Sequence, residues 1–334
     1  MNTPPEQRPG VYGWSPGRGG VHFHRIAEPL RVLAELGHRT STGPQLDDEI
    51  LDTVDTVLAH TLHGEAETKA WHELARIGTH RLVLDVDDWL WAPDIPSLRD
   101  AYPPDVLDRL FSNVERAHVV TTPSGVIASY LSRFNRNVWV VPNTVPAYVL
   151  DIPRPDVTEN GLWLGWQGAL NRSADWKTAA AGVAKFLSRH EDWGIGIIGE
   201  AAIDDNGTDR HWVKPWTSDR KAYYASVAAF TIGLGPLRDT LFNRAKSSLR
   251  AVEYAALGVV PVLPDLDPYR HVIKSGRNGY LVRDFQTHRR VLTEIAANLE
   301  WLDAMGKQAR DDAANWTTEA AIGAWAEAWN SIGA

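Results

Sequence analysis

Short apolar runs alternate with amphipathic stretches along most of the chain. RLVLDV (81–86) has the length and composition of a buried strand, whereas RIAEPLRVLAELGH (25–38) has helical spacing and ends at a glycine. An alternation of strands and helices is typical of a parallel α/β sheet. Further strands are predicted at 54–60, 118–124, 137–143, 161–168, 193–200, 227–236 and 259–264, and a helix capped by Ser247 or Ser248 is predicted over 247–258.

The chain length and one proline-rich segment predict two domains. The 334 residues exceed one ordinary core. Residues 144–161 show no clear periodicity and are interpreted as the linker. The predicted domains are therefore 1–150 and 151–312, followed by a helical tail, 313–334, expected to pack back on the first domain. Doubly wound domains bind ligands at the carboxyl ends of their strands, so a central cleft is the expected place for the site.

Composition excludes several classes of function. The chain has no cysteine, which rules out disulfides, thiolate metal sites and a cysteine nucleophile, and favours a cytoplasmic protein. The chain has no run of 18 apolar residues, so no membrane span is predicted. The absence of GxGxxG, GxxxxGK[ST] and GxSxG patterns disfavours a dinucleotide enzyme, a P-loop ATPase and a serine hydrolase.

Charge is concentrated in one segment. The chain carries a net charge of -8, but residues 210–290 hold 14 Lys and Arg against 6 Asp and Glu, a net charge of +8. A local basic segment in an acidic protein fits a small anionic ligand, such as a nucleotide diphosphate, better than a long polyanion.

The strongest motif is FNRAKSSLRAVEYAALGVVPVL (242–263). Lys246 is predicted at a loop-to-helix junction, where a cation and a helix N-terminus together favour a phosphate. Glu253 is predicted two turns further along the same helix and on the same side, where its carboxylate could accept hydrogen bonds from a ribose diol. Solvated charges on an amphipathic helix are the alternative.

EYAALGVVPVL and the following SGRNGYLV (275–282) resemble the nucleotide-sugar half of GT-B glycosyltransferases, especially family 4. AHVVTTPSGVIASYL, VWVVPNTV, LGWQG and SPGRGGVHFHRIAEPLRVLAELGH resemble other parts of that family, so the resemblance covers most of the chain. It implies a GT-B fold of two Rossmann-like domains and metal-independent transfer of a sugar from a UDP- or GDP-sugar, or a related donor, with retention of anomeric configuration.

The resemblance also assigns donor-site residues. Glu253 would hold the ribose, and Lys246 would contact the diphosphate and stabilise the leaving group. Where the family usually has a second glutamate, this chain has Ala245, and Asn243 and Lys246 suggest a divergent subgroup. The remaining donor-binding candidates are Gly19, Gly20, Gly168, Arg244 and Arg250.

VLDVDDWLW (83–91) admits two interpretations. Its Asp-x-Asp could hold a metal against a donor diphosphate, but the second half of the chain already supplies a donor site that needs no metal. Asp87 and Asp88 are therefore predicted to face the acceptor or the transferred sugar, and Asp85 to be structural. Trp89 and Trp91 are predicted either to line the acceptor pocket or to pack in the core.

Histidines give weaker signals. His60 ends a predicted strand and, by the resemblance, would face the donor sugar, with a structural role as the alternative. The pairs His60 with His63 and His22 with His24 lack a third ligand at fixed spacing, which disfavours a metal site. The acceptor stays open between a glycan or small molecule and the hydroxymethylated pyrimidines of DNA, as in phage enzymes. A non-catalytic sugar-nucleotide binder and an epimerase are further alternatives.

Overall fold

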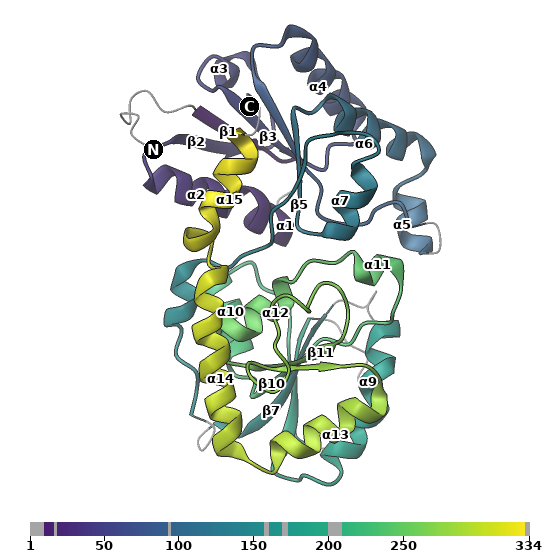
Figure 1. Cartoon of the computed structure of the whole chain (residues 1–334), viewed down its shortest axis with the longest axis vertical. Helices are drawn as coiled ribbons and strands as arrows, with labels where there is room; N and C mark the ends of the chain where they lie inside the picture. Colours follow the sequence, from purple (N-terminus) through teal and green to yellow (C-terminus); the bar gives the residue numbers. More distant parts are fainter. Residues whose placement is uncertain are drawn as a thin grey trace. The chain divides into compact units, whose positions relative to one another are not determined.

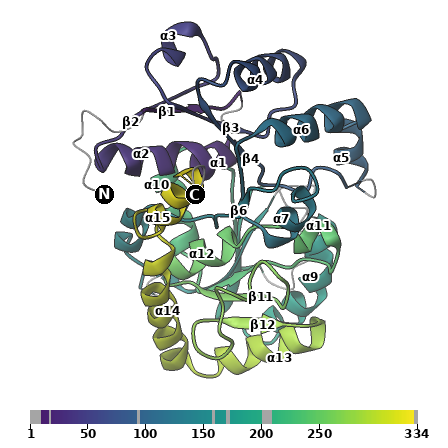
Figure 2. The same ribbon diagram turned by 45° about the horizontal axis from the view of Figure 1, so that its top comes forward.

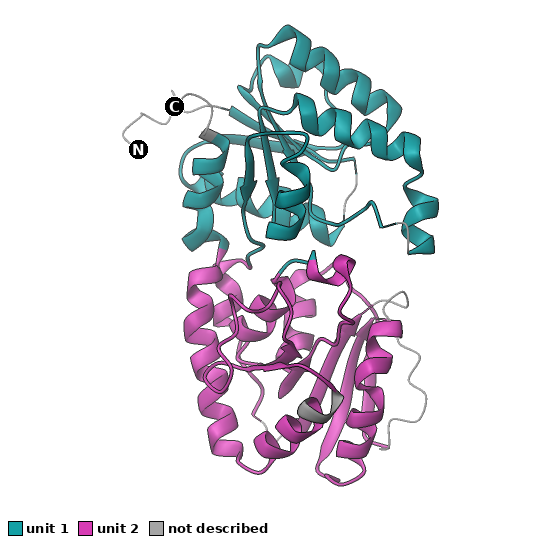
Figure 3. Ribbon diagram, turned by 45° about the vertical axis from the view of Figure 1, so that its right-hand side comes forward, with its two compact units in different colours: residues 1–144, 245–247, 318–334 teal, residues 145–244, 248–317 magenta. Residues whose placement is uncertain are grey.

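The computed structural model describes residues 10–16, 19–92, 95–156, 160–168, 173–199 and 209–330. The chain divides into two compact units (Figure 3). Unit 1 comprises residues 1–144, 245–247 and 318–334, and unit 2 comprises residues 145–244 and 248–317. The first division, between residues 144 and 145, lies close to the predicted one, and the terminal segment groups with unit 1 from residue 318.

Unit 1 is built on a parallel sheet of six strands in the order β2-β1-β3-β4-β5-β6. Figure 1 labels β1, β2, β3 and β5 of this sheet. The chain passes from β1 to β2 on one side and then to β3 on the other, so the strand order reverses between β1 and β3. The strands are β1 Gly10–Trp14, β2 Arg39–Gly43, β3 Thr56–His60, β4 Arg81–Asp85, β5 Val119–Thr122 and β6 Val138–Val140.

Helices cover both faces of this sheet. One face packs Ile26, Leu30 and Leu33 with Trp325 and Trp329 of the last helix. The helical elements are α1 Gly20–His22, the π-helix η2 Phe23–Ala27, α2 Glu28–Glu35, α3 Asp48–Leu51, α4 Glu65–Ile77, α5 Pro96–Ala101, α6 Pro104–Arg116, α7 Gly125–Leu131 and α15 Thr318–Asn330.

Unit 2 has a second parallel sheet of six strands, in the order β12-β11-β10-β7-β8-β9. Here the order reverses between β7 and β10, and the ends of these two strands form the switch point where doubly wound sheets bind ligands. The strands are β7 Leu162–Gly168, β8 Trp193–Gly199, β9 His211–Lys214, β10 Ile232–Leu234, β11 Val260–Pro264 and β12 Tyr280–Val282.

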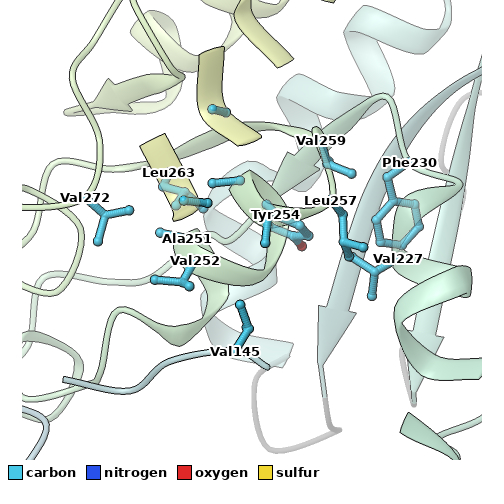
Figure 4. Packing of buried hydrophobic residues seen from close by; sticks show 14 of the residues in the cluster. Val145, Val227, Phe230, Ala251, Val252, Tyr254, Leu257, Val259, Leu263 and Val272 are labelled. Carbon is cyan, nitrogen blue, oxygen red and sulfur yellow. The ribbon is translucent and has the colours of Figure 1, made fainter. Parts of the chain in front are cut away.

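Two hydrophobic cores lie on opposite faces of the unit 2 sheet. One is formed with α9 and α13, and the other with α10 and α12 (Figure 2). Tyr254 of α12 packs in the second core beside Leu257 and Val227 (Figure 4). The helical elements are η3 Ala147–Asp151, α9 Ser173–Leu187, α10 Arg220–Ala228, α11 Leu241–Arg244, α12 Leu249–Ala256, α13 Phe285–Ala296, α14 Leu299–Ala313 and η5 Ala314–Trp316.

The predicted α/β class with two doubly wound parallel sheets is confirmed. The sequence pattern missed β1, β2 and β9, and β12 was indicated only by the family resemblance of SGRNGYLV (275–282). Strands β2 and β9 are mostly exposed and lie at sheet edges, so they carry no apolar run. Strand β1 is fully buried, but its glycines interrupt the pattern. Gly13 is needed there because a Cβ would lie 2.4 Å from the Ile26 side chain.

The predicted cap of α12 needs a correction. Ser248 occupies the N-cap position, but its side chain accepts no hydrogen bond from the helix. Its backbone is already helical, with φ -76° and ψ -1°. A capping side chain normally comes from an extended residue, which turns the oxygen toward the free N–H groups.

Candidate functional site

In unit 2, three buried polar side chains meet at the switch point. Gln167 is the last residue but one of β7, Tyr223 comes from α10 and Glu253 from α12. Glu253 Oε2 accepts hydrogen bonds from Gln167 Nε2 and from the Tyr223 hydroxyl, each at 3.1 Å. The Tyr223 hydroxyl also contacts Gln167 Oε1. The three residues expose 1%, 6% and 5% of their surfaces, so the carboxyl group is held in one orientation.

Burial sets the protonation of Glu253. Removal from water raises its pKa to about 7, and the hydrogen bonds from Tyr223 and Gln167 and the charge of Arg250 only partly offset this effect. A carboxyl group kept near the neutral point in a ligand-binding region is a functional-site candidate. Within the described residues both of its hydrogen bonds go to Oε2, which leaves Oε1 available to a ligand.

Arg250 places a partly buried cation beside this carboxyl group. Its Nη1 is buried and has no hydrogen-bond partner among the described residues. Burial lowers the pKa of the guanidinium, but Tyr254, Tyr269, Tyr223 and Glu253 more than offset this and hold it above its ordinary value. Buried charges are rarely left unpaired in proteins. The site therefore has the electrostatic character of an anion-binding position.

The end of β10 makes room for Arg250. A Cβ on Gly235 would lie 2.8 Å from Arg250 Cδ, so the arginine side chain packs directly on the glycine backbone. Two more buried oxygens lie just before or at the start of α12 without a partner among the described residues, Ser248 Oγ and Asn243 Oδ1. The helix N-terminus adds a favourable dipole for an anion.

The predicted relation between Lys246 and Glu253 is wrong. Helix α12 begins at Leu249, so Lys246 precedes it and the two side chains do not share a helix face. Lys246 belongs to unit 1 together with Ala245 and Ser247. This short segment is tied to unit 1 by Asn143 Nδ2, which donates to Ser247 Oγ at 3.1 Å.

The other predicted donor residues have local partners. Asn243 Nδ2 donates to Asp175 Oδ1 at 2.9 Å, and Arg244 forms a two-point ion pair with Asp239 at 2.6 and 2.8 Å. Gly168 lies at the end of β7, where a Cβ would come within 2.3 Å of the Trp166 ring. Within unit 2, packing alone therefore accounts for the glycine at 168.

In unit 1, Gly19 and Gly20 follow β1 at the start of α1. A Cβ on Gly19 would meet nothing within 4 Å, so close packing does not require a glycine there. Gly17 of the same loop lies outside the described residues.

Unit 1 contains a second polar cluster, at the ends of β3 and β4. His60 Nε2 bonds Asp87 Oδ1 at 3.1 Å. Burial lowers the pKa of His60, but the hydrogen bond and charge of Asp87, with the charge of Asp85, raise it overall. Burial and the charges of Asp88 and Asp87 likewise raise the pKa of Tyr102, which places that phenol near both carboxylates.

Backbone strain marks the same position. Thr61, which follows His60, has φ +45°, a left-handed conformation that is rare for a β-branched residue. Its hydroxyl lies 3.2 Å from His60 Nε2 and its N–H donates to the Asp85 carbonyl at 2.8 Å. Such strain concentrates at functional sites.

Asp85, which the sequence analysis assigned a structural role, is fully buried and ion-paired. It pairs with Arg25 of the π-helix at 2.6 Å and accepts from the Thr121 hydroxyl at 2.6 Å. Arg25 also donates to Asn143 Oδ1 and lies 4.4 Å from the Trp325 ring centroid. This buried network joins the sheet of unit 1 to η2 and α15.

The predicted acceptor tryptophans lie in an aromatic cluster. Trp89 and Trp91 are each 8% exposed, and their ring centroids are 4.7 Å apart. The Trp91 ring stacks on Tyr130 at 4.6 Å, and Phe111 packs against its edge. The indoles are thus held rigidly, with a small part of their surface exposed.

Sequence reasoning missed Gln167 and Tyr223, which hold Glu253. Gln167 stands in an apolar strand, LWLGWQG, and a polar residue in a buried strand was the available signal. In the described ranges no three His, Asp or Glu residues are arranged to hold a metal ion. Among those same residues no helix has the length and apolar character needed to span a membrane.

No family model and no curated protein sequence matches the chain. Solved structures are similar. A sucrose-phosphate synthase from Thermosynechococcus elongatus has a TM-score of 0.67 at 13% identity, with 98% of this chain and 99% of that chain covered. The Anabaena protein Alr3699/HepE, in complex with UDP and glucose, has a TM-score of 0.67 at 13% identity, with 98% and 100% covered.

A third structure, a putative UDP-N-acetylglucosamine 2-epimerase from Listeria monocytogenes, has a TM-score of 0.57 at 13% identity, with 95% of this chain and 94% of that chain covered. At such low identity the likeness establishes the fold and no more. The chain has the GT-B fold, with two Rossmann-like α/β units.

Proposed function

We propose that the protein is a glycosyltransferase that moves a sugar from a nucleoside diphosphate sugar to an acceptor hydroxyl. The observation that carries the proposal is the pair formed at the switch point of unit 2 by the buried Glu253 and the partly buried Arg250. A carboxyl group with an oxygen free to accept hydrogen bonds, beside a guanidinium with an unpartnered buried nitrogen, matches a ribose diol next to a phosphate.

The donor is proposed to bind through its nucleotide. Glu253 accepts hydrogen bonds from the ribose hydroxyls, and Arg250 neutralises the diphosphate, with Lys246 as the second cation. The UDP present in the structurally similar Anabaena protein makes uridine diphosphate the first nucleotide to test. Positive side chains and a helix N-terminus would stabilise the leaving diphosphate without a metal ion.

The polar cluster of unit 1 is proposed to handle the acceptor and the transferred sugar. Asp87 and His60 are held together and are only partly buried, so they can position hydroxyl groups. The two carboxylates, Asp87 and Asp88, disfavour a phosphate-rich acceptor such as DNA and favour a glycan or a small hydroxylated molecule. Trp89 and Trp91 would contribute their exposed edges to this acceptor site.

We infer retention of configuration, with the leaving phosphate taking the proton of the acceptor hydroxyl on the same face of the sugar. The residues then act by positioning and by electrostatic stabilisation of the leaving group. Product anomeric configuration, read by proton NMR, tests retention. Activity that survives EDTA would support metal independence, and its loss with rescue by magnesium or manganese would refute it.

The first experiment is a thermal-shift screen with the UDP, GDP, ADP and dTDP sugars, because a bound donor raises Tm by mass action. Release of nucleoside diphosphate with and without candidate acceptors then separates a transferase from a binder or an epimerase. Epimerisation would change the sugar without forming an acceptor product.

Three variants test the residue roles. Glu253→Ala and Arg250→Ala are expected to weaken UDP binding about 10-fold or more, because each removes a charge-assisted hydrogen bond. Lys246→Ala is expected to lower turnover at saturating donor. Arg277→Ala, which removes an exposed ion pair with Asp312, is the matched control and should change neither quantity. Wild-type UDP affinity in both donor variants would refute the assignment.

A further inference from the structure

A pocket of about 320 Å³ opens in unit 2 beside the switch point, on the side of β10 that faces β11 and β12 rather than β7. It lies at the carboxyl ends of β10, β11 and β12, on the face of the sheet that α9 and α13 cover. Its inner wall is apolar except for one imidazole and consists of Ala179, Leu237, Val262, Val282 and His288, each exposed by only 2 to 7%. The volume lies within the range of small-molecule sites.

His288 gives the pocket one polar contact point. The residue is 6% exposed and its side chain lines the pocket. Burial lowers its pKa to about 4, so at pH 7 the ring is neutral and offers one donor and one acceptor. A single imidazole on an otherwise apolar pocket wall is the kind of polar group that orients a ligand in a small-molecule site.

Charges at the mouth of the pocket balance. Arg238 and Arg283 are matched by Asp239 and Asp284. Arg238 lies 3.4 Å from Asp175, and Arg283 lies 3.5 Å from Asp265. A charged ligand would gain little from such a mouth and would lose hydration against the apolar wall. The pocket therefore suits an uncharged ring compound with one hydrogen-bonding edge.

The pocket wall is bonded to the segment that leads into the donor site. Asp175 of α9 lies one turn before Ala179 of the pocket. Its Oδ1 accepts from the Arg238 backbone N–H at 3.0 Å and from Asn243 Nδ2 at 2.9 Å. The Asp175 carboxylate thus holds both Arg238, in the pocket-lining segment 236–239, and Asn243, which lies five residues before Ser248. A ligand that displaces this segment acts on the start of α12.

We propose that this pocket is a second ligand site, which takes a small uncharged aromatic heterocycle through a hydrogen bond to His288 and modulates the donor site. The modulation rests on the proposed donor role of Arg250 and Glu253, whereas the pocket itself does not.

Two fluorinated probes test the pocket by ¹⁹F NMR titration. 5-Fluoroindole has an N–H donor, and 1-methyl-5-fluoroindole has the same ring without it. The first is expected to bind about threefold or more tighter to the native chain, the gain from one hydrogen bond. His288→Phe keeps a ring of similar size and should bring the ratio of the two affinities close to one.

A variant at the mouth supplies an independent check. Thr178 is exposed at the edge of the pocket, so Thr178→Trp covers the opening without disturbing the core. It should reduce the affinity for both probes about 10-fold or more. Equal affinity for the two probes in the native chain, or binding unchanged in Thr178→Trp, would refute the site.

The effect on the donor site is measured as the Kd for UDP with and without saturating 5-fluoroindole. A change of about threefold or more in the native chain, absent in Thr178→Trp, is expected. An unchanged Kd with the probe bound would overturn the modulating role. If the probe binds and UDP does not bind at all, the proposed donor site and the modulation both fail and the pocket stands.

Discussion

Replacing Glu253 by glutamine should stabilise the ligand-free protein while damaging its function. Burial raises the pKa of Glu253 from 4.5 to about 7. One pKa unit corresponds to about 1.4 kcal/mol, so keeping this carboxylate ionised in the folded state costs about 3 kcal/mol above pH 7. Glutamine has no charge to desolvate, and its carbonyl can accept the same bonds from Tyr223 and Gln167.

The sign of the pH dependence follows from the raised pKa. Between pH 4.5 and 7 the folded state holds a proton that the unfolded state has released, so the native stability falls as pH rises. Glu253→Gln removes this loss. The free energy of unfolding of the variant should exceed that of the native chain by less than about 1 kcal/mol at pH 5. The difference should grow through pH 6 and 7 and level off at about 3 kcal/mol at pH 8.

Differential scanning fluorimetry from pH 5 to pH 8 measures the effect as a rise in the Tm of unit 2, about 5 to 10 °C at pH 8. Glu294→Gln, on an exposed position of α13, is the matched control and should give no pH-dependent change. The same Glu253 variant should bind UDP about 10-fold or more weakly. If the Tm of Glu253→Gln rises equally at pH 5 and pH 8, or falls at pH 8, then burying the Glu253 carboxylate does not carry the free-energy cost proposed for it.

Two further predictions concern packing and the buried ion pair. Arg25→Ala leaves the Asp85 carboxylate buried and uncompensated, so the free energy of unfolding measured in urea should fall by about 3 to 5 kcal/mol. A fall below about 1 kcal/mol would show that the ion pair is dispensable. Gly165→Ala places a Cβ 1.9 Å from the Phe230 ring and should lower the free energy of unfolding by about 1 to 3 kcal/mol. In Gly323→Ala on α15 the new Cβ meets nothing within 4 Å, so this variant should raise the free energy of unfolding by up to about 1 kcal/mol. Equal effects of the two substitutions in circular dichroism melts would contradict the packing argument.

The sequence pattern was most informative where strands are buried. Runs such as RLVLDV and GLWLGWQG carry continuous apolar character because both faces of a parallel sheet are covered. Edge strands β2 and β9 lack this burial, and their polar residues give no signal. The α/β class and the doubly wound organisation could therefore be predicted, and the edges of the sheets could not.

The candidate site was only partly predictable. Glu253 was predicted as a site residue from its motif, and the local spacing then suggested a shared helix with Lys246. Helix α12 begins at Leu249, three residues after Lys246, and the preceding segment 245–247 belongs to unit 1. Where a helix begins depends on what its first turn packs against, which spacing alone does not encode.

The order of apolar runs along the chain was enough to predict the α/β class, and the sequence also showed the basic segment that contains Glu253. Only the tertiary structure brought Gln167 and Tyr223 to that carboxyl group, across 86 and 30 residues of chain. The tertiary structure also shows that Arg250 has a buried nitrogen without a partner among the described residues, and that Asp85 forms a buried ion pair with Arg25. The physical reason is that burial and hydrogen-bond partners, which set charge and pKa, come from segments that are distant in sequence.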